Sequence, residues 1–243
     1  MDSFSPETLA IALAVGALAG LVRGITGFGG AMVMSPPLAL LVGPLLAVPA
    51  VLLLEGFAAA PMLIQTRRLV RWRVIAPIIA AACVTIPLGA LVLMRADPVL
   101  LRRGIAATVI VFSLVLLLGW RYKGEQRVAT ALALGAVSGT LVGATSMGGP
   151  PVILYLLAGP DRVDTTRANL TFFVCAISAA GIAVLWAGGV LGLRAVWLAA
   201  ALAPGYYGGM VLGTKAFARF NDQRFRRFTL LLMMAVATGI VLA

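Results

Sequence analysis

The stretch GITGFGG, residues 24–30, interrupts a chain made largely of apolar runs. One apolar run at 8–23 precedes it and another at 31–43 follows it. Adjacent glycines disfavour a continuous helix, because glycine loses more backbone freedom on folding than other residues. Where such runs cross a bilayer, non-helical backbone is tolerated only if it is buried in protein or lines a cavity. The stretch therefore predicts a helix break beside a cavity.

Composition assigns the chain to the membrane. Of its 243 residues, 62% are hydrophobic and 11% are charged, and the mean hydropathy is +1.07. These values predict an all-α, multi-pass membrane protein whose partner is the lipid bilayer. The net charge of +11 could suggest a nucleic-acid partner. However, the basic residues form short clusters between apolar runs with almost no aromatic residues among them, so no nucleic acid is expected.

Ten apolar segments follow one another along the chain. They lie at 8–23, 31–43, 45–66, 74–94, 101–120, 128–142, 151–159, 168–188, 195–214 and 228–243. A helix needs about 20 residues to cross the hydrocarbon core. The segments on either side of residues 24–30 and of residues 143–150 are shorter than that, whereas the other six are long enough or nearly so. Whether the short segments span the membrane or turn back at mid-depth stays open.

The distribution of basic residues predicts the orientation. The connections at 67–73, 121–127, 160–167 and 215–227 hold 14 Lys and Arg residues, whereas the alternate connections hold four. Cytoplasmic loops carry such an excess, so both termini are predicted to be periplasmic. The first apolar run is flanked by Asp2 and Glu7 rather than by basic residues. We therefore expect it to remain in the mature protein rather than to be cleaved as a signal.

The two halves of the chain carry the same motif. At an offset of 119 residues, LAVGALAGLVRGITGFGG (13–30) matches LALGAVSGTLVGATSMGG (132–149) at nine of 18 positions, five of them glycines. We interpret residues 1–123 and 124–243 as two repeats within one membrane domain. Each repeat has about five helical segments and an odd number of crossings. The repeats are therefore expected to be inverted, with their broken helix pairs meeting near the midplane.

Paired helix breaks of this kind favour an anion-binding site. Half-helices beginning near Gly30 and Gly149 would direct the positive ends of their dipoles at one central region. Threonine and serine hydroxyls there suit the oxygens of a sulfonate, sulfite or carboxylate. The predicted substrate-binding residues are Arg23, Thr26, Gly27, Gly29, Gly30, Thr145, Ser146, Gly148, Gly149 and Asn169. The glycines spaced by four before each break, at 16, 20 and 24 and at 135, 139 and 143, are assigned mainly to close helix packing.

Three polar residues leave alternatives open. Glu55 is the one carboxylate predicted within a spanning helix. It is either a proton-coupling site, a partner for Arg23 or a structural tether between helices. Arg23 could neutralise a bound anion or extend to the cytoplasmic interface. Asn169 could donate to a substrate oxygen or cap its helix.

These motifs resemble the TauE/SafE family of anion exporters and permeases. The resemblance rests on GALAGLVRGITGFGG (16–30) followed by AMVMSPPLALL (31–41), and on GTLVGATSMGGPPVILYLL (139–157). It implies a bacterial inner-membrane carrier for sulfite, sulfoacetate, sulfonates or related organic anions. Family members often carry a serine-rich segment after each motif. Here PAVLLLEGFAAAP (49–61) and RANLTFFVCAISAAG (167–181) stand instead, so the substrate is not fixed by the resemblance.

The sequence therefore predicts a secondary transporter that moves a small anion by alternating access. A passive anion channel with the same broken-helix site is the alternative. We expect no enzymatic activity, cofactor or metal, because the chain has no histidine and its acidic residues are scattered. A homodimer and a proton as coupling ion are compatible with the sequence, which does not decide between import and export.

Overall fold

The computed structural model describes residues 5–118, 127–156 and 163–217, together with residues 234 and 238. All regular structure in these ranges is helical, and seven of the described helices are long and apolar enough to cross a membrane. The predicted all-α membrane fold is therefore confirmed. The elements are α1 (Pro6–Thr26), α2 (Gly30–Val42), α3 (Pro44–Thr66), the short 3₁₀ turn η1 (Arg67–Leu69), α4 (Trp72–Arg95), α5 (Pro98–Leu117), α6 (Val128–Thr145), α7 (Gly149–Leu156), α8 (Val163–Ala187) and α9 (Leu193–Phe217).

Local chemistry sets the ends of these helices. The Ser5 and Asp97 side chains accept hydrogen bonds from the first turns of α1 and α5, and a proline follows each cap. At the other end of α1, Gly27 adopts the left-handed conformation with φ of 76°, which glycine enters without a steric penalty. The half-helices α2 and α7 begin at Gly30 and Gly149. Both predicted breaks and both predicted half-helix starts are confirmed.

The helices before the breaks are longer than the sequence predicted. In the sequence, segments 8–23 and 128–142 are shorter than the roughly 20 residues of a full span, which leaves open whether they cross. In the structure, α1 has 21 residues and α6 has 18, and both qualify as spans. Both helices extend past the predicted segment ends because the first glycine of each motif stays helical. A Cβ on Gly24 or on Gly143 would overlap the backbone of a neighbouring helix. Close packing therefore holds glycine in a helix despite its low intrinsic propensity. The C-terminal segment 228–243 lies almost wholly outside the described residues.

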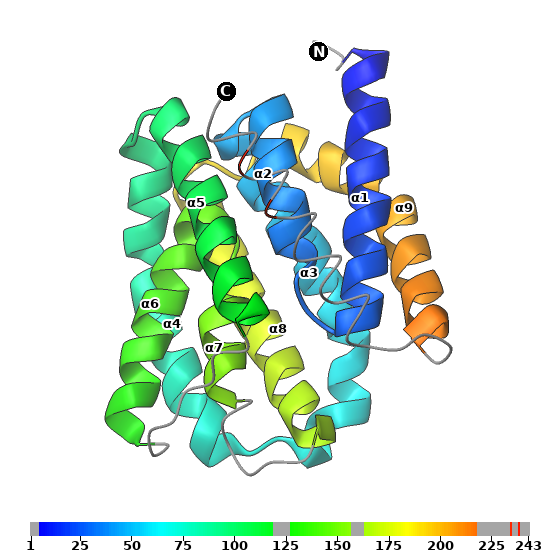
Figure 1. Cartoon of the computed structure of the whole chain (residues 1–243). Coiled ribbons are helices and arrows are strands. Elements are labelled where there is room, and N and C mark those ends of the chain that lie inside the picture. The colour runs from blue at the N-terminus through cyan, green and yellow to red at the C-terminus, as the bar shows by residue number, and fades with distance from the viewer. Residues whose placement is uncertain (1–4, 119–126, 157–162, 218–233, 235–237, 239–243) are drawn as a thin grey trace.

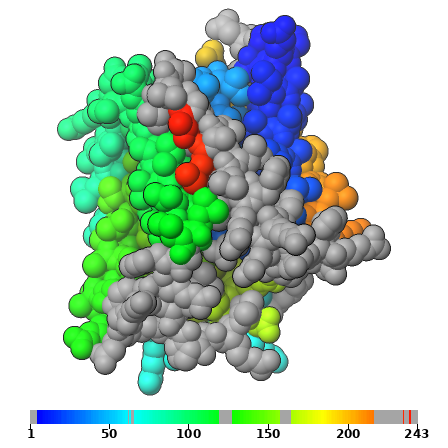
Figure 2. Space-filling view, viewed as in Figure 1, coloured from blue at the N-terminus to red at the C-terminus, as the bar shows by residue number. Residues whose placement is uncertain are grey.

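Helices distant in sequence form the main packing pairs. α1 runs along α9, α4 runs along α6, and α3 faces α8 between them (Figure 1). In the space-filling view, α1 and α9 form one edge of the molecule and α4, α5 and α6 form the other (Figure 2). The glycines spaced by four residues lie at the α1–α9 and α4–α6 interfaces. A Cβ on Gly20 would overlap the Tyr206 carbonyl, and a Cβ on Gly139 would overlap the Ala82 carbonyl. Their assignment to close helix packing is confirmed.

This contact gives a first prediction. Gly20→Ala places a methyl group against the α9 backbone, and forcing such a group into a packed interface typically costs about 1–3 kcal/mol. We expect a lowered melting temperature in detergent, measured by tryptophan fluorescence or light scattering. The matched control is Gly104→Ala in α5, where an added Cβ meets no atom within 4 Å. Equal melting temperatures for the two variants would contradict the close α1–α9 contact.

The basic clusters gather toward one end of the bundle. The end of α3 with η1 and the starts of α4, α6 and α8 lie at the lower end in Figure 1, and the end of α9 lies in the lower half, about level with the end of α1. The start of α1 and the α4–α5 and α8–α9 connections lie at the upper end. The described basic residues in or beside these helix ends are Arg67, Arg68, Arg71, Arg73, Arg127, Arg167 and Lys215. The described basic residues of the connections that are rich in Lys and Arg thus lie toward one side of the protein.

Candidate functional site

A small cavity lies between the two helix breaks. Its volume is about 40 Å³, whereas one water needs roughly 10–15 Å³ measured in this way. The cavity can therefore hold a few waters or the head of a small ligand. Its walls come from both breaks and from α3 and α8. The lining residues are Arg23, Gly27, Phe28, Gly29, Ala31, Met32, Leu52, Glu55, Ser146, Met147, Gly148, Gly149, Pro150, Leu170, Val174, Ile177 and Ser178.

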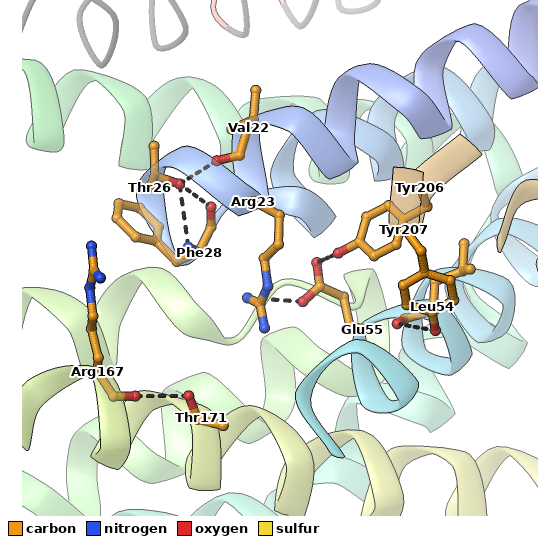
Figure 3. Close-up of polar contacts among 10 residues, drawn as sticks. All are labelled: Val22, Arg23, Thr26, Phe28, Leu54, Glu55, Arg167, Thr171, Tyr206 and Tyr207. Atoms are coloured by element: carbon orange, nitrogen blue, oxygen red, sulfur yellow. Dashed lines mark hydrogen bonds and ion pairs between the residues drawn. The ribbon is translucent and has the colours of Figure 1, made fainter. Parts of the chain in front are cut away.

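Three polar side chains meet at one side of this cavity. Arg23 Nη1 lies 3.0 Å from Glu55 Oε2, and the Tyr206 hydroxyl donates to Glu55 Oε1 at 2.8 Å. Figure 3 shows the guanidinium of α1 and the phenol of α9 converging on the carboxylate of α3 (Figure 3). All three side chains are buried. Arg23 therefore does not extend to the interface, and Glu55 is its partner.

No other charged side chain in the described part of the chain shares this burial. Arg23 is 8% exposed and Glu55 is 5% exposed, whereas every other described acidic residue is exposed and every other described basic residue is exposed or partly exposed. Removing a charge from water is costly unless it is paired and hydrogen-bonded. The ion pair and the tyrosine satisfy this requirement. Charge at such a depth in a membrane protein commonly marks a ligand or ion pathway.

The start of α2 packs closely against the cluster of Arg23, Glu55 and Tyr206. A Cβ at Gly30 would lie 2.7 Å from the Tyr206 hydroxyl and would overlap Glu55 Oε1. A side chain here would have to displace Glu55 and Tyr206, so glycine is favoured by the approach of these side chains rather than by its own backbone conformation. The cluster and the helix break form one packed unit.

Backbone donors face the cavity mainly from α2. The N–H groups of its first turn have no acceptor within the helix, and its N-cap, Gly29, provides no side-chain cap. At the start of α7, Pro150 and Pro151 carry no N–H. The positive end of the α2 dipole and the Arg23 guanidinium thus make this side of the cavity the more attractive to an anion.

Ser146 closes α6 in an unfavourable conformation. Its φ is 62°, and it is the one non-glycine residue with positive φ in the described part of the chain. Such a conformation costs roughly 1–2 kcal/mol for a residue with a Cβ. The Ser146 hydroxyl lies 2.6 Å from the Ser35 hydroxyl and donates to the Thr145 carbonyl at 2.5 Å. Strain of this kind is often retained where a side chain serves a site.

Paired substitutions separate the strain from the hydroxyl. Ser146→Gly and Ser146→Ala both remove the hydroxyl, but only alanine keeps the cost of the left-handed backbone. We expect the glycine variant to be the more stable of the two by about 1 kcal/mol, measured by thermal unfolding. If the hydroxyl contacts the ligand, both variants should lose affinity equally. An alanine variant as stable as the glycine variant would contradict the positive φ.

The predicted site residues divide into two groups. Those lining the cavity are Arg23, Gly27, Gly29, Ser146, Gly148 and Gly149, together with Glu55; those outside the lining are Thr26, Gly30, Thr145 and Asn169. The hydroxyl of Thr26 donates to the Val22 carbonyl at 2.8 Å and to the Phe28 carbonyl. Thr145 donates to the Leu141 carbonyl at 2.6 Å. Both hydroxyls thus hold the ends of their own helices.

Asn169 lies away from the cavity lining. It is fully buried, and its Oδ1 accepts a hydrogen bond from the backbone N–H of Arg71 at 2.9 Å. The side chain thereby joins α8 to the connection before α4. Its Nδ2 is buried and has no partner in the structure. A direct role of Asn169 at the substrate stays a prediction, as do the substrate contacts of the other predicted residues.

Sequence reasoning missed several residues of the site. Tyr206 is the most important, because its hydroxyl donates the second polar contact to the Glu55 carboxylate, beside the ion pair with Arg23. Its signal was available, since PGYYGG (204–209) places two phenols in an apolar helix. Phe28 and Met147 lie inside the two repeated break motifs, although they were not singled out there. Ser35 and Ser178 had no such signal and reach the site through the folding of α2 and α8.

A larger cavity elsewhere has a different character. Its volume is about 420 Å³, and its described lining comes from α5, α6 and α7: Phe112, Val115, Leu118, Leu134, Val137, Pro151, Leu154 and Tyr155. None of these residues is charged. A charged ligand would find no counter-charge there, so size alone does not identify the polar site.

Membrane-length apolar helices, with two helix breaks lining one cavity that holds a buried Arg–Glu pair, define a multi-pass membrane protein, and paired helix breaks of this kind are typical of secondary transporters. The sequence model of the family described as "Sulfite exporter TauE/SafE" matches residues 12–240, and the chain belongs to this family. The resemblance seen in the motifs is thereby confirmed. No curated protein and no solved structure matches the chain significantly.

Proposed function

We propose that the protein is a secondary transporter that carries a small anion across the bacterial inner membrane by alternating access. The observation that carries this proposal is the buried Arg23, which faces a small cavity between two broken helices. The anion would bind between the guanidinium, the free N–H groups at the start of α2 and the Ser146 hydroxyl. Membership of a family of sulfite exporters supports the same conclusion.

Correspondence between the two halves supports alternating access. At the offset of 119 residues, α1, α2, α3 and α4 correspond to α6, α7, α8 and α9, and the starts of α2 and α3 at 30 and 44 coincide with those of α7 and α8 at 149 and 163. The packing pairs α1–α9 and α4–α6 then exchange under the same correspondence. Inverted repeats 1–123 and 124–243 would produce this arrangement, and rocking one against the other would open the cavity to either side.

The cavity walls favour a particular class of substrate. One side carries the charged and hydrogen-bonding groups, whereas Leu170, Val174 and Ile177 form an apolar wall on α8. A sulfonate or carboxylate head with a short hydrocarbon part would match both sides, and sulfite would match the polar side alone. The small volume excludes large substrates in this conformation. Sulfite, sulfoacetate, other small sulfonates and related organic anions are therefore the proposed substrates.

The sidedness of the basic clusters supports an orientation. The described Lys and Arg residues of the rich connections lie toward one end of the bundle, which cytoplasmic loops would do. We place that end in the cytoplasm, and the start of α1 accordingly lies on the periplasmic side.

Two measurements on the purified full chain test this function. A thermal-shift panel with sulfite, sulfate, sulfoacetate, methanesulfonate and acetate should show selective stabilisation by the bound anion, because a ligand of the folded state raises the melting temperature. In proteoliposomes, the same anion should show saturable uptake that is accelerated by unlabelled anion on the far side. Flux without saturation or exchange would identify a channel. A flat panel together with absent flux would overturn the proposal.

A further inference from the structure

A carboxylate side chain of the protein itself, that of Glu55, lines the cavity beside Arg23. Glu55 holds Arg23 in an ion pair of 3.0 Å. An incoming anion that binds the guanidinium must therefore compete with this carboxylate. The competition matters because Arg23 is the one buried cation in the described part of the chain.

Charge balance decides how the competition can be resolved. The ion pair is neutral as it stands. Adding a monoanion would leave one net negative charge in a buried site, which is strongly unfavourable. If Glu55 takes up a proton as the anion arrives, the carboxylate becomes a neutral carboxylic acid and Arg23 pairs with the anion instead. Net charge is then zero before and after binding.

The groups around Glu55 can accommodate this change. Arg23 faces it from α1, and Tyr206 donates to it from α9. The neighbouring phenol of Tyr207 donates instead to the Leu54 carbonyl at 3.4 Å. The α2 side presents Gly30, and α8 presents Val174 and Ser178 to the cavity; none of these has a titratable side chain. Apart from the guanidinium of Arg23 and the phenols of Tyr206 and Tyr207, these helices bring no titratable side chain to Glu55. A hydroxyl can both donate and accept, so Tyr206 can remain bonded to either form of the acid.

The two halves of the chain differ at these positions. The offset of 119 residues places Val142 opposite Arg23 and Val174 opposite Glu55. The second half therefore supplies neither a second cation nor a second carboxylate at the cavity. One exchangeable pair sets the stoichiometry at one proton for each monoanion.

We propose that Glu55 is the binding site of a coupling proton, and that the protein carries one proton together with each monoanion in an electroneutral symport. The proton joins a Glu55 oxygen when the anion displaces that carboxylate from Arg23, and it leaves when the ion pair forms again. Both ligands reach the site through the same cavity. This inference rests on the proposed anion transport.

Transport by the parent protein tests the inference directly. Radiolabelled methanesulfonate is a suitable probe because it is a strong-acid anion that stays charged at every pH used. In proteoliposomes, a pH gradient of one unit should drive accumulation of up to about tenfold, with the anion moving away from the acidic side. A potassium–valinomycin potential should leave the accumulation unchanged. Potential-driven uptake that ignores the pH gradient would overturn the proton coupling while leaving anion transport intact. Absence of any uptake would instead reject sulfonate transport and the coupling together.

The variant Glu55→Gln provides an independent test. Glutamine keeps a side chain of similar shape but cannot take up the proton. We expect pH-driven accumulation to fall from about tenfold to none, while the remaining flux follows the membrane potential. Asp97→Asn is the matched control, because Asp97 is an exposed carboxylate that caps α5. Tenfold pH-driven accumulation by Glu55→Gln would show that the proton binds elsewhere.

Discussion

Arg23→Gln is expected to abolish anion uptake and to lower the free energy of unfolding by about 3–5 kcal/mol. The substitution removes the buried cation from the cavity and leaves the Glu55 carboxylate buried without a counter-charge. Removing one partner of a buried ion pair costs far more than removing both, because the remaining charge is uncompensated. Uptake in proteoliposomes and thermal unfolding in detergent measure the two effects.

The double variant Arg23→Gln/Glu55→Gln separates stability from transport. With both charges removed, Tyr206 can still bond to an amide at position 55, so most of the lost stability should return. Uptake should stay absent, because the cavity has no cation. The control Arg103→Gln changes an exposed arginine and should alter stability by no more than about 0.5 kcal/mol. Anion uptake by the double variant at the parent rate would contradict the role of Arg23.

Much of the fold could be predicted from the sequence. Hydropathy and glycine clustering located the membrane helices, both breaks and the starts of α2 and α7, because these features depend on local composition. The ends of α1 and α6 could not be placed correctly. Gly24 and Gly143 remain helical through contacts with α9 and α4, and those contacts join residues far apart in the chain.

The site was predictable only in part. The motifs identified the glycines, Arg23 and Ser146. Glu55 could be recognised because it is an isolated carboxylate within an apolar run. The bond between Tyr206 and Glu55 joins residues 151 positions apart, which no local pattern encodes. The matched threonines suggested shared substrate contacts. In the structure, Thr26 and Thr145 donate to carbonyls of their own helices. The repeated threonines therefore stabilise the ends of α1 and α6.

The two half-helices allow the asymmetry of the site to be tested at equivalent positions. Gly30 and Gly149 occupy the same place in the repeated motif and begin α2 and α7. An added Cβ at Gly30 would overlap Glu55 and Tyr206, whereas one at Gly149 would meet no atom within 4 Å. We expect Gly30→Ala to destabilise the protein by on the order of 3 kcal/mol, because it must displace the buried charged cluster. Gly149→Ala should leave the free energy of unfolding close to that of the parent.

Thermal unfolding of the two alanine variants, measured side by side in one detergent, tests this difference. A symmetric pair of breaks would predict equal losses, since the sequence motif treats the two glycines alike. The asymmetric cluster predicts a large loss at position 30 only. In the background of Arg23→Gln/Glu55→Ala, which lacks both charges and the oxygen that the new methyl group would strike, Gly30→Ala should cost less stability than it does in the parent. Equal melting temperatures for Gly30→Ala and Gly149→Ala would contradict the packing of Arg23, Glu55 and Tyr206 against the first break.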